Sequence, residues 1–350
     1  MRAFILLILL CHTLDSIPEY YEVCNPVDMP MQLFIDEEIN NLPTALDLVK
    51  NRKPVAKGAS GEVFINTFPS QTYPRVAIKV MQFNEYSDTE IYLMEKMGKP
   101  MYGPKLIGCQ YHSPNNWPID LYLVQEEMTS DFDNRETRRA FTRLNKILKL
   151  DILKKMLLRI GKVWDLEYAH NDVKPANFMY KNTLNDVYIT DFGMATPIDG
   201  PLSPAGSLIF ICPGKFTEKK PSIKHDIYSW AVTAVVIHTT SNKIEDSELF
   251  TDPDQNRIMS YITTKKISDD CFSGPRTPEC KDKLIRNVSR IMQANGWGEL
   301  VRNEERNIIY EANLTSLVSH IIDYDNFTLD LELVARILSI FTAHYAQNKI

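Results

Sequence analysis

The spacing of apolar residues predicts a strand-rich part of the chain followed by a helix-rich part. Apolar and β-branched residues alternate over residues 55–68 and 73–83, which is typical of two strands. Apolar residues at helical spacing follow over residues 88–97 and stop at a glycine and a proline, which predicts one helix. Residues 105–112 and 120–128 have the composition of two further strands.

From about residue 132 onward the pattern becomes helical. Residues 150–170 repeat apolar positions three and four apart, which predicts a long helix with one face in the core. Residues 226–240, 282–293 and 331–346 predict further helices. We therefore predict an α+β fold of two lobes, a small β-rich N-lobe with one helix and a larger helical C-lobe, with a cleft between them.

The composition is compatible with this prediction and excludes some classes of function. The chain has 350 residues, 44% hydrophobic and 24% charged, which is ordinary for a soluble globular protein of one large domain or two lobes. The net charge of −6 does not indicate a partner such as nucleic acid or an anionic membrane surface.

The N-terminus has the features of a secretory signal peptide. Arg2 precedes an apolar run over residues 3–10, and small and polar residues follow, so cleavage is expected after Thr13 or Ser16. The run is too short to span a bilayer as a helix. The alternative is a buried first strand or a retained hydrophobic segment. Beyond it, residues 17–47 are acidic, contain several prolines and show no clear periodicity.

Sequons and cysteines agree with a secreted or secretory-pathway protein without establishing it. Three sequons that could carry glycans begin at Asn287, Asn313 and Asn326. Removal of the leader would leave five cysteines: Cys24, Cys109, Cys212, Cys271 and Cys280. Cys271 and Cys280 flank a Gly-Pro turn and could form a small disulfide loop, but an odd number cannot all pair within the chain. No cysteine or histidine spacing indicates zinc.

Two segments in the strand-rich part carry candidate phosphate-binding groups. Gly58 and Gly61 lie between two predicted strands, where glycines let backbone N–H groups approach a phosphate. Lys79 ends an apolar strand segment, and burying a lysine there is costly without an anionic partner. Glu90 on the following helix could be that partner. A plain turn and an exposed lysine are the alternatives for each segment taken alone.

The segment HNDVKPANF, residues 170–178, holds three chemically active side chains within six positions. Asp172, Lys174 and Asn177 would be ordinary in a solvated loop, so their context decides. Downstream, the aspartate of ITDFG is Asp191 and the aspartate of HDIYSW is Asp226.

In this order and spacing, the segments resemble the eukaryotic protein kinase superfamily. The resemblance implies that Asp172 orients the attacking hydroxyl and Lys174 offsets charge on the transferred phosphoryl group. It implies that Asn177 and Asp191 bind Mg²⁺, with Mn²⁺ also possible, and that Lys79 holds the α- and β-phosphates of ATP. Further ATP contacts are implied for Ala56, Gly58, Gly61, Val63, Ala77, Glu90, Gln125, Glu126, Met128 and Met179.

The resemblance also implies a substrate class. Lys174, two positions after the aspartate, is typical of serine/threonine kinases, and the form of the loop is similar to that of the casein kinase one group. A protein substrate with a Ser/Thr hydroxyl is therefore expected, without nucleic acid or a membrane span. Oligomeric state is not indicated. The alternatives are a secreted pseudokinase that acts by binding a nucleotide or a partner, and a kinase of small molecules.

Three positions depart from the family pattern. Ala56 replaces the first glycine of the loop, and residues 212–214 read Cys-Pro-Gly where the family has Ala-Pro-Glu. Asn171 replaces the arginine that normally pairs with a phosphorylated activation segment, so no such switch is expected. Lys79, Asp172, Asn177 and Asp191 are all present, which favours an active enzyme.

The expected organisation is a signal peptide over residues 1–16, an extension over 17–47 and a kinase domain over 48–345. Within the domain, the N-lobe would cover about 48–127 and the C-lobe about 128–345.

Overall fold

The computed structural model describes residues 24–348 except for ten internal segments: 59–60, 85, 113–119, 203–205, 208–209, 217, 240–277, 299–300, 306–307 and 324–328. For residues 216, 278–284, 301–305 and 308–312 it describes the backbone alone. The chain divides into two compact units. The first unit is Met1–Tyr92 with Leu106–Gln125, and the second unit is Leu93–Lys105 with Glu126–Ile350. The predicted signal peptide and the predicted Cys271–Cys280 bond lie outside the described residues.

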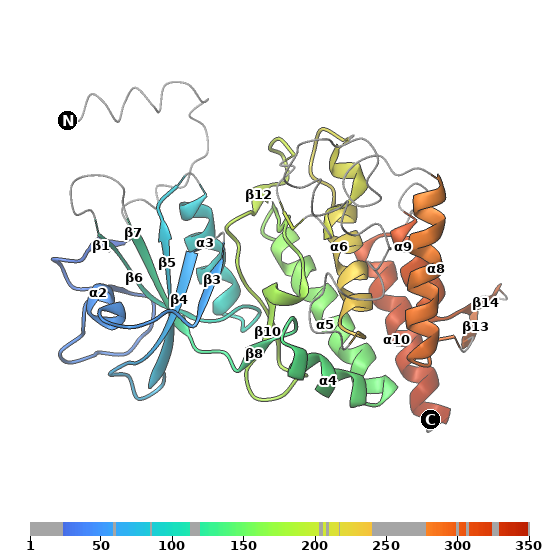
Figure 1. The fold of residues 1–350 in the computed structure, drawn as a ribbon, viewed down its shortest axis with the longest axis horizontal. Coiled ribbons are helices and arrows are strands. Elements are labelled where there is room, and N and C mark those ends of the chain that lie inside the picture. Colours follow the sequence, from blue (N-terminus) through green and yellow to red (C-terminus); the bar gives the residue numbers. More distant parts are fainter. Residues whose placement is uncertain are drawn as a thin grey trace. The chain divides into compact units, whose positions relative to one another are not determined.

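The first unit is built on a seven-stranded sheet in the order β1-β6-β7-β5-β4-β3, with β2 paired to β6 (Figure 1). Its strands are β1 Asn25–Pro26, β2 Gln32–Leu33, β3 Ala56–Gly58, β4 Gly61–Thr67, β5 Arg75–Gln82, β6 Leu106–His112 and β7 Asp120–Glu126. Its helices are α2 Ala45–Val49 and the first half of α3 Ser87–Gly98, whose second half, from Leu93, belongs to the second unit. The strands and the helix predicted from the apolar pattern between residues 55 and 128 are confirmed.

The N-terminal extension is an integral part of this sheet, although its sequence shows no periodicity. β1 pairs in parallel with β6, and β2 pairs antiparallel to the same strand. The fully buried Gln110 joins two parts of the extension, because its Nε2 donates to the Met29 carbonyl at 2.7 Å and its Oε1 accepts from the Ala45 N–H at 2.6 Å. The extension thus supplies partners for a polar side chain that could not be buried alone.

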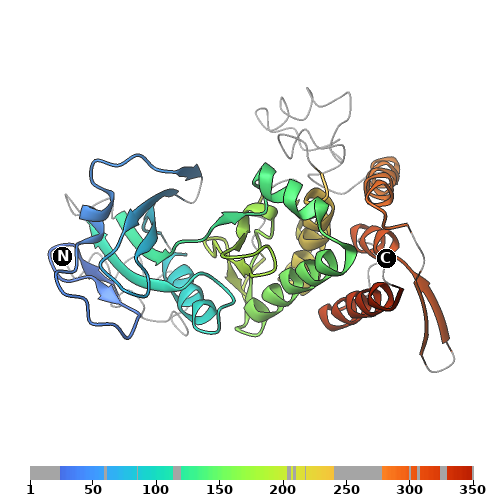
Figure 2. The ribbon, with the colours of Figure 1, turned by 90° about the horizontal axis from the view of Figure 1, so that it is seen from below.

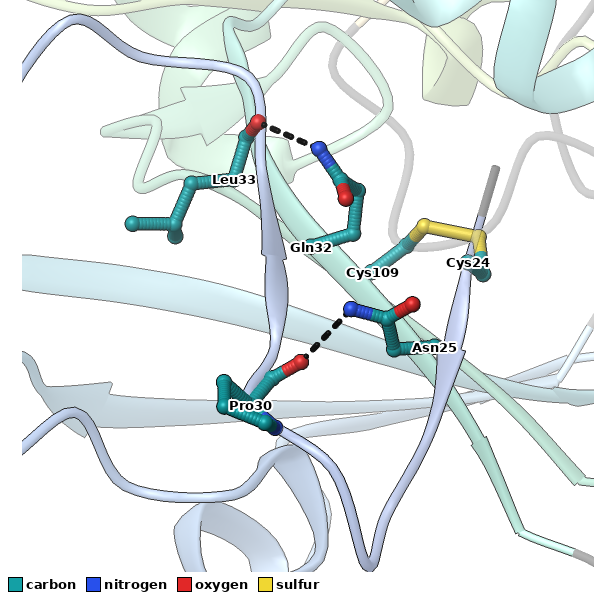
Figure 3. Close-up of a disulfide and its surroundings, with 6 residues drawn as sticks. All are labelled: Cys24, Asn25, Pro30, Gln32, Leu33 and Cys109. Carbon is teal, nitrogen blue, oxygen red and sulfur yellow. Dashed lines mark hydrogen bonds between the residues drawn. A yellow bond between two sulfur atoms is a disulfide. The ribbon is translucent and has the colours of Figure 1, made fainter. Parts of the chain in front are cut away.

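A disulfide between Cys24 and Cys109 fastens the start of the extension to the middle of β6 (Figure 3). The two Cα atoms are 5.3 Å apart, which is within the usual range for a disulfide. Farther along, Met31 and Ala45 of the extension pack into a buried apolar cluster. The other members of this cluster are Leu48, Phe64, Phe68, Val76, Ile78, Ile107, Tyr122 and Val124.

The second unit is mainly helical. Its helices are α4 Arg135–Arg143, α5 Lys146–Trp164, α6 Ile223–Val236, α8 Pro278–Ala294, α9 Leu314–Ile322 and α10 Leu331–Asn348. The helices predicted near residues 150–170, 226–240, 282–293 and 331–346 are confirmed. Short strands complete the unit: β8 Ser130–Asp131, β9 Tyr168–Ala169, β10 Phe178–Tyr180, β11 Val187–Ile189, β12 Thr196–Pro197, β13 Val301–Glu305 and β14 Ile308–Ala312.

Helix α6 is the centre of this unit, and its residues from His225 to Val236 are buried. A helix that is apolar on all sides is expected to be surrounded by other elements, and α5 and α9 pack against it. Helix α10 runs beside α5, as the red and green helices of Figure 2 show. Among the described residues, no helix combines the length and apolar character needed to cross a bilayer.

Candidate active site

The carboxylate of Asp172 is the centre of a buried hydrogen-bond network in the second unit. Asp172 is 7% exposed and follows β9. Its Oδ2 lies 2.6 Å from the Lys174 ammonium and accepts from Asn177 Nδ2 at 3.1 Å. Its Oδ1 accepts from the backbone N–H of Ser207 at 2.9 Å. The three polar side chains of the segment 170–178 that were predicted to act together are therefore in contact.

The backbone of the predicted catalytic loop, residues 170–178, is held by Asp226 at the start of α6. Its Oδ2 accepts from the Trp164 indole N–H at 2.8 Å and from the His170 N–H at 2.9 Å. Its Oδ1 accepts from the Asn171 N–H at 3.0 Å. A carboxylate that receives several N–H groups is well satisfied although it is buried, so Asp226 fixes the two residues before Asp172.

His170 connects the catalytic loop to the segment that contains Asp191. Its Nδ1 accepts from the Asp172 N–H at 3.3 Å, which leaves Nε2 to donate to the Thr190 carbonyl at 3.2 Å. Its ring also packs on the ring of Phe192, with centroids 5.5 Å apart. The loop and the Asp191 segment are thus joined on both sides of Asp191.

Asn177 and Asp191, the two predicted metal ligands, lie on adjoining backbone segments. The Thr190 N–H donates to the Asn177 carbonyl at 3.0 Å, which brings the next residue, Asp191, close to Asn177. Asp191 has φ +62°, a left-handed conformation that a non-glycine residue adopts only where the surroundings hold it.

The donor set itself has the chemistry of a magnesium site. Asn177 uses its Nδ2 on Asp172, so its Oδ1 is the atom left to bind a cation. An amide oxygen and a carboxylate are hard donors, which suit Mg²⁺ or Mn²⁺. Mg²⁺ is commonly bound by one or two such groups together with substrate phosphates.

In the first unit, Lys79 and Glu90 form a buried ion pair of 2.5 Å between Nζ and Oε1. Their side chains are 9% and 1% exposed. Lys79 lies on β5 opposite Val63 of β4, and Glu90 lies on α3. The expected partner of the strand lysine is therefore confirmed as a contact, and α3 supplies the charge that makes its burial tolerable.

The glycine turn connects β3 and β4, with Ala56 opposite Val63 and Gly58 opposite Gly61. Gly61 has φ +127°, and a Cβ there would lie 2.3 Å from the Val80 carbonyl oxygen. Only glycine fits such a close approach of two strands. Residues 59–60 at the tip lie outside the described residues.

The other residues expected to contact adenine are placed as follows. In the first unit, Ala77 is buried on β5 and Gln125 is buried on β7. In the second unit, Met128 is buried, and Met179 on β10 pairs with Asp131 of β8. The roles of these residues in binding ATP remain predictions.

Glu126, at the end of β7, carries an ion pair that the sequence did not indicate. Its carboxylate binds the Lys181 ammonium, and its Oε2 accepts from the Lys105 N–H at 3.3 Å. The expected adenine contact of Glu126 also remains a prediction.

Ser207 and Lys215 carry no local sequence signal and were missed, and the contacts of Asn171 were not predicted either. The Ser207 hydroxyl accepts from the Lys174 ammonium at 2.9 Å, in addition to its backbone contact with Asp172. Asn171, in the position of the family arginine, donates through Nδ2 to the Met194 carbonyl at 3.1 Å and to the Thr196 hydroxyl at 2.8 Å. Lys215 donates to the Asn171 carbonyl at 3.0 Å. All these contacts join positions far apart in the chain.

The family model for the protein kinase domain matches residues 49–326. The chain belongs to the protein kinase family. The α+β prediction, a β-rich part followed by a helical part, is confirmed by this match and by the structure.

Relatives named as kinases, two of them as serine/threonine-protein kinases, support this assignment at low identity. The chain is 30% identical over 160 residues to a probable serine/threonine-protein kinase of Dictyostelium discoideum, over 42% of this chain and 31% of the relative. It is 26% identical over 156 residues to serine/threonine-protein kinase PknA of Nostoc, over 42% and 27%. It is 21% identical over 197 residues to an L-type lectin-domain containing receptor kinase of Arabidopsis thaliana, over 54% and 30%. The chain therefore spans about a third or less of the length of these curated relatives.

Proposed function

We propose that this protein kinase transfers the γ-phosphoryl group of ATP to Ser/Thr hydroxyls of protein substrates. The observation that carries the proposal is the network around Asp172, in which Lys174, Asn177 and Ser207 hold both carboxylate oxygens. Phosphoryl transfer depends mainly on positioning the reacting groups and on stabilising the negative charge that spreads over the transferred phosphoryl group. The groups of this network can do both.

Each of these groups has a distinct role in the proposal. Asp172 orients the substrate hydroxyl and accepts its proton, while the Lys174 ammonium offsets charge on the transferred group. Asn177 and Asp191 hold Mg²⁺, which neutralises charge on the phosphates when it is bound. Lys79, held by Glu90, binds the α- and β-phosphates of ATP.

The decisive experiment compares two aspartate variants with the natural protein. Purified protein is incubated with Mg²⁺, radiolabelled ATP and a mixed protein substrate, and the labelled residue is identified by mass spectrometry. We expect Ser/Thr labelling that Asp172→Asn abolishes and Asp199→Asn, a change of an exposed aspartate, leaves intact. Equal labelling by Asp172→Asn and the natural protein would reject the proposal. Nucleotide binding without transfer in the natural protein would favour a pseudokinase instead.

A finer assignment within the family is also proposed. The segment HNDVKPANF is similar to the catalytic loop of the casein kinase one group, and the chain lacks the Ala-Pro-Glu motif. We infer that the protein belongs beside that group. Labelling that falls on tyrosine, or on a small molecule and not on protein, would contradict this assignment.

We further propose that the protein works in the secretory pathway or outside the cell as a glycoprotein. The apolar N-terminal run has the form of a signal peptide, and disulfides such as Cys24–Cys109 persist in oxidising compartments. Of the sequons, Asn287 is half-buried on α8, and Asn326 lies outside the described residues. Asn313 caps α9 through its side chain.

Expression in a secretory host followed by N-terminal sequencing tests the location. We expect a mature protein that begins after Thr13 or Ser16 and is sensitive to glycosidase. Protein that still begins at Met1 and stays in the cell lysate would contradict the proposal.

A further inference from the structure

Lys215 is a buried lysine whose ammonium group faces the backbone of the catalytic loop. It lies in the short 3-10 helix η4 Pro213–Phe216, is 5% exposed and donates to the Asn171 carbonyl at 3.0 Å. Burial lowers the pKa of Lys215, while the nearby carboxylates of Asp226 and Asp172 favour its charged form. Because burying an ammonium group is costly, a buried lysine at this place is expected to have a specific role.

The peptide that joins Asn171 to Asp172 is held at both of its polar groups. Its carbonyl oxygen accepts from Lys215, and its N–H donates to His170 Nδ1 at 3.3 Å. The preceding N–H, that of Asn171, donates to Asp226. Asn171 has φ +65°, so the backbone before Asp172 is in a conformation that needs such support.

A glycine of the same downstream segment approaches the same carbonyl group. Gly206 has φ +136°, and a Cβ there would lie 2.7 Å from the Asn171 carbonyl oxygen. The next residue, Ser207, donates its N–H to the Asp172 carboxylate. Gly206 and Lys215 therefore contact the backbone before Asp172, and Ser207 contacts the carboxylate itself.

We propose that Lys215 is a positioning residue for the phosphoryl transfer proposed above, on which this inference rests. Its ammonium group fixes the Asn171 carbonyl and thereby the backbone that carries Asp172. The cation is supplied by the downstream segment, whereas Asn171 is neutral and uses its Nδ2 on Met194 and Thr196. The Lys215 ammonium group thus links the downstream segment to the catalytic loop, and this link does not require phosphorylation of the segment.

Steady-state kinetics of matched lysine variants test the proposal. Lys215→Met removes the charge and keeps much of the side-chain volume, Lys215→Arg keeps the charge, and Lys220→Met removes an exposed charge from the same segment. We expect Lys215→Met to lower kcat about 10- to 100-fold, because small displacements of a reacting group cost this much. The KM for ATP is expected to stay within about 2-fold, since no ATP contact is removed. Lys215→Arg should recover most of kcat, and Lys220→Met should not change it.

The split between kcat and KM separates positioning from a general loss of structure. Unchanged kcat in folded Lys215→Met, or equal losses in the Met and Arg variants, would overturn the proposal. A fall in kcat that only follows a smaller active fraction, measured by active-site titration, would overturn it as well.

Amide hydrogen exchange tests the same inference without activity, so that it can fail or succeed separately from the proposed function. In Lys215→Met, residues 170–177 are expected to exchange at least about 10-fold faster, while the α5 amides stay unchanged. Gly206→Ala places a Cβ against the same carbonyl oxygen and should give the same local effect. Gly298→Ala, whose Cβ would meet only the Gln293 side chain at 3.3 Å, serves as its control.

Protection of residues 170–177 that is identical in the natural protein and both variants would overturn the proposal. Absence of phosphoryl transfer in the natural protein would refute the function instead.

Discussion

The indole N–H of Trp297 donates a hydrogen bond of 2.9 Å to Nε2 of His238. The other ring nitrogen, Nδ1, lies 2.6 Å from the Ala234 carbonyl and so carries the proton. His238 is therefore neutral, because a second proton on Nε2 would face the Trp297 N–H. Burial lowers the pKa of His238 to about 4, and the nearby Lys149 also lowers it.

The neutral state of His238 makes stability depend on pH. Between pH 6.5 and about 4, His238 is protonated in the unfolded chain and neutral in the folded protein. The free energy of unfolding therefore falls as the pH falls through this window. The contribution of neutral His238 to the free energy of unfolding is fully present above pH 6.5 and amounts to roughly 3 kcal/mol. Urea unfolding at pH 7 and pH 4.5 measures it in the natural protein and in His238→Gln, which does not titrate. Identical pH dependence in the two proteins would rule out this role of His238.

The disulfide that anchors the N-terminal extension is expected to stabilise the first unit strongly. Cys24 and Cys109 are 85 residues apart, and closing so long a loop lowers the entropy of the unfolded chain by about 4 to 5 kcal/mol at 25 °C. Non-reducing peptide mapping should recover the two cysteine-containing peptides joined. Chemical denaturation should show similar losses for Cys24→Ser, Cys109→Ser and the double variant, since each breaks the same bond. Additive losses would show that the two cysteines act independently.

The buried pair of Lys79 and Glu90 is expected to be sensitive to loss of one partner. Glu90→Gln leaves an ammonium group in a nearly dry site, which should cost about 3 to 5 kcal/mol of stability and raise the KM for ATP. Glu95→Gln, on the same helix, removes a contact to Lys99, whose side chain is 56% exposed, and should cost less than about 1 kcal/mol. Thermal unfolding and ATP titration measure both variants. Equal costs for the two changes would contradict the special status of the buried pair.

Asp226 is expected to hold the catalytic loop through its hydrogen bonds to the His170 and Asn171 N–H groups. Asp226→Asn places an NH₂ group where three N–H donors now meet a carboxylate, which should cost roughly 2 to 4 kcal/mol and accelerate amide exchange at His170 and Asn171. Asp165→Asn, in an exposed contact with Lys162, is the matched control and should cost less than about 1 kcal/mol. If exchange at the two loop amides does not change, Asp226 does not hold the loop.

Secondary structure was predictable where apolar periodicity is strong. Helix α5 repeats buried residues three and four apart along nineteen residues, and α6 is apolar almost throughout. Helix α4 was missed because its sequence RETRRAFTR is mostly charged, and it buries only Thr137, Arg138 and Phe141. Helix α2 has only five residues and gives too short a pattern to detect.

The N-terminal extension shows the limit of local patterns most clearly. Its strands β1 and β2 have two residues each, so no alternation can develop. Their structure depends on β6, on the buried Gln110 and on Cys109, all more than 60 residues away in the chain. Only packing against these distant partners gives the extension its conformation.

The residue types needed for phosphoryl transfer, and their order along the chain, follow from the amino-acid sequence alone. Asp172, Lys174 and Asn177 lie within one short segment, and Lys79 and Asp191 belong to motifs that are equally local. The sequence also suggested Glu90 as the partner of Lys79. Only the tertiary structure showed that Ser207 binds the Asp172 carboxylate and that Asp226 and Lys215 hold the backbone before it. The physical reason is that a hydrogen bond or buried ion pair depends on distance in space, and residues remote in sequence come within 3 Å only after the hydrophobic core has formed.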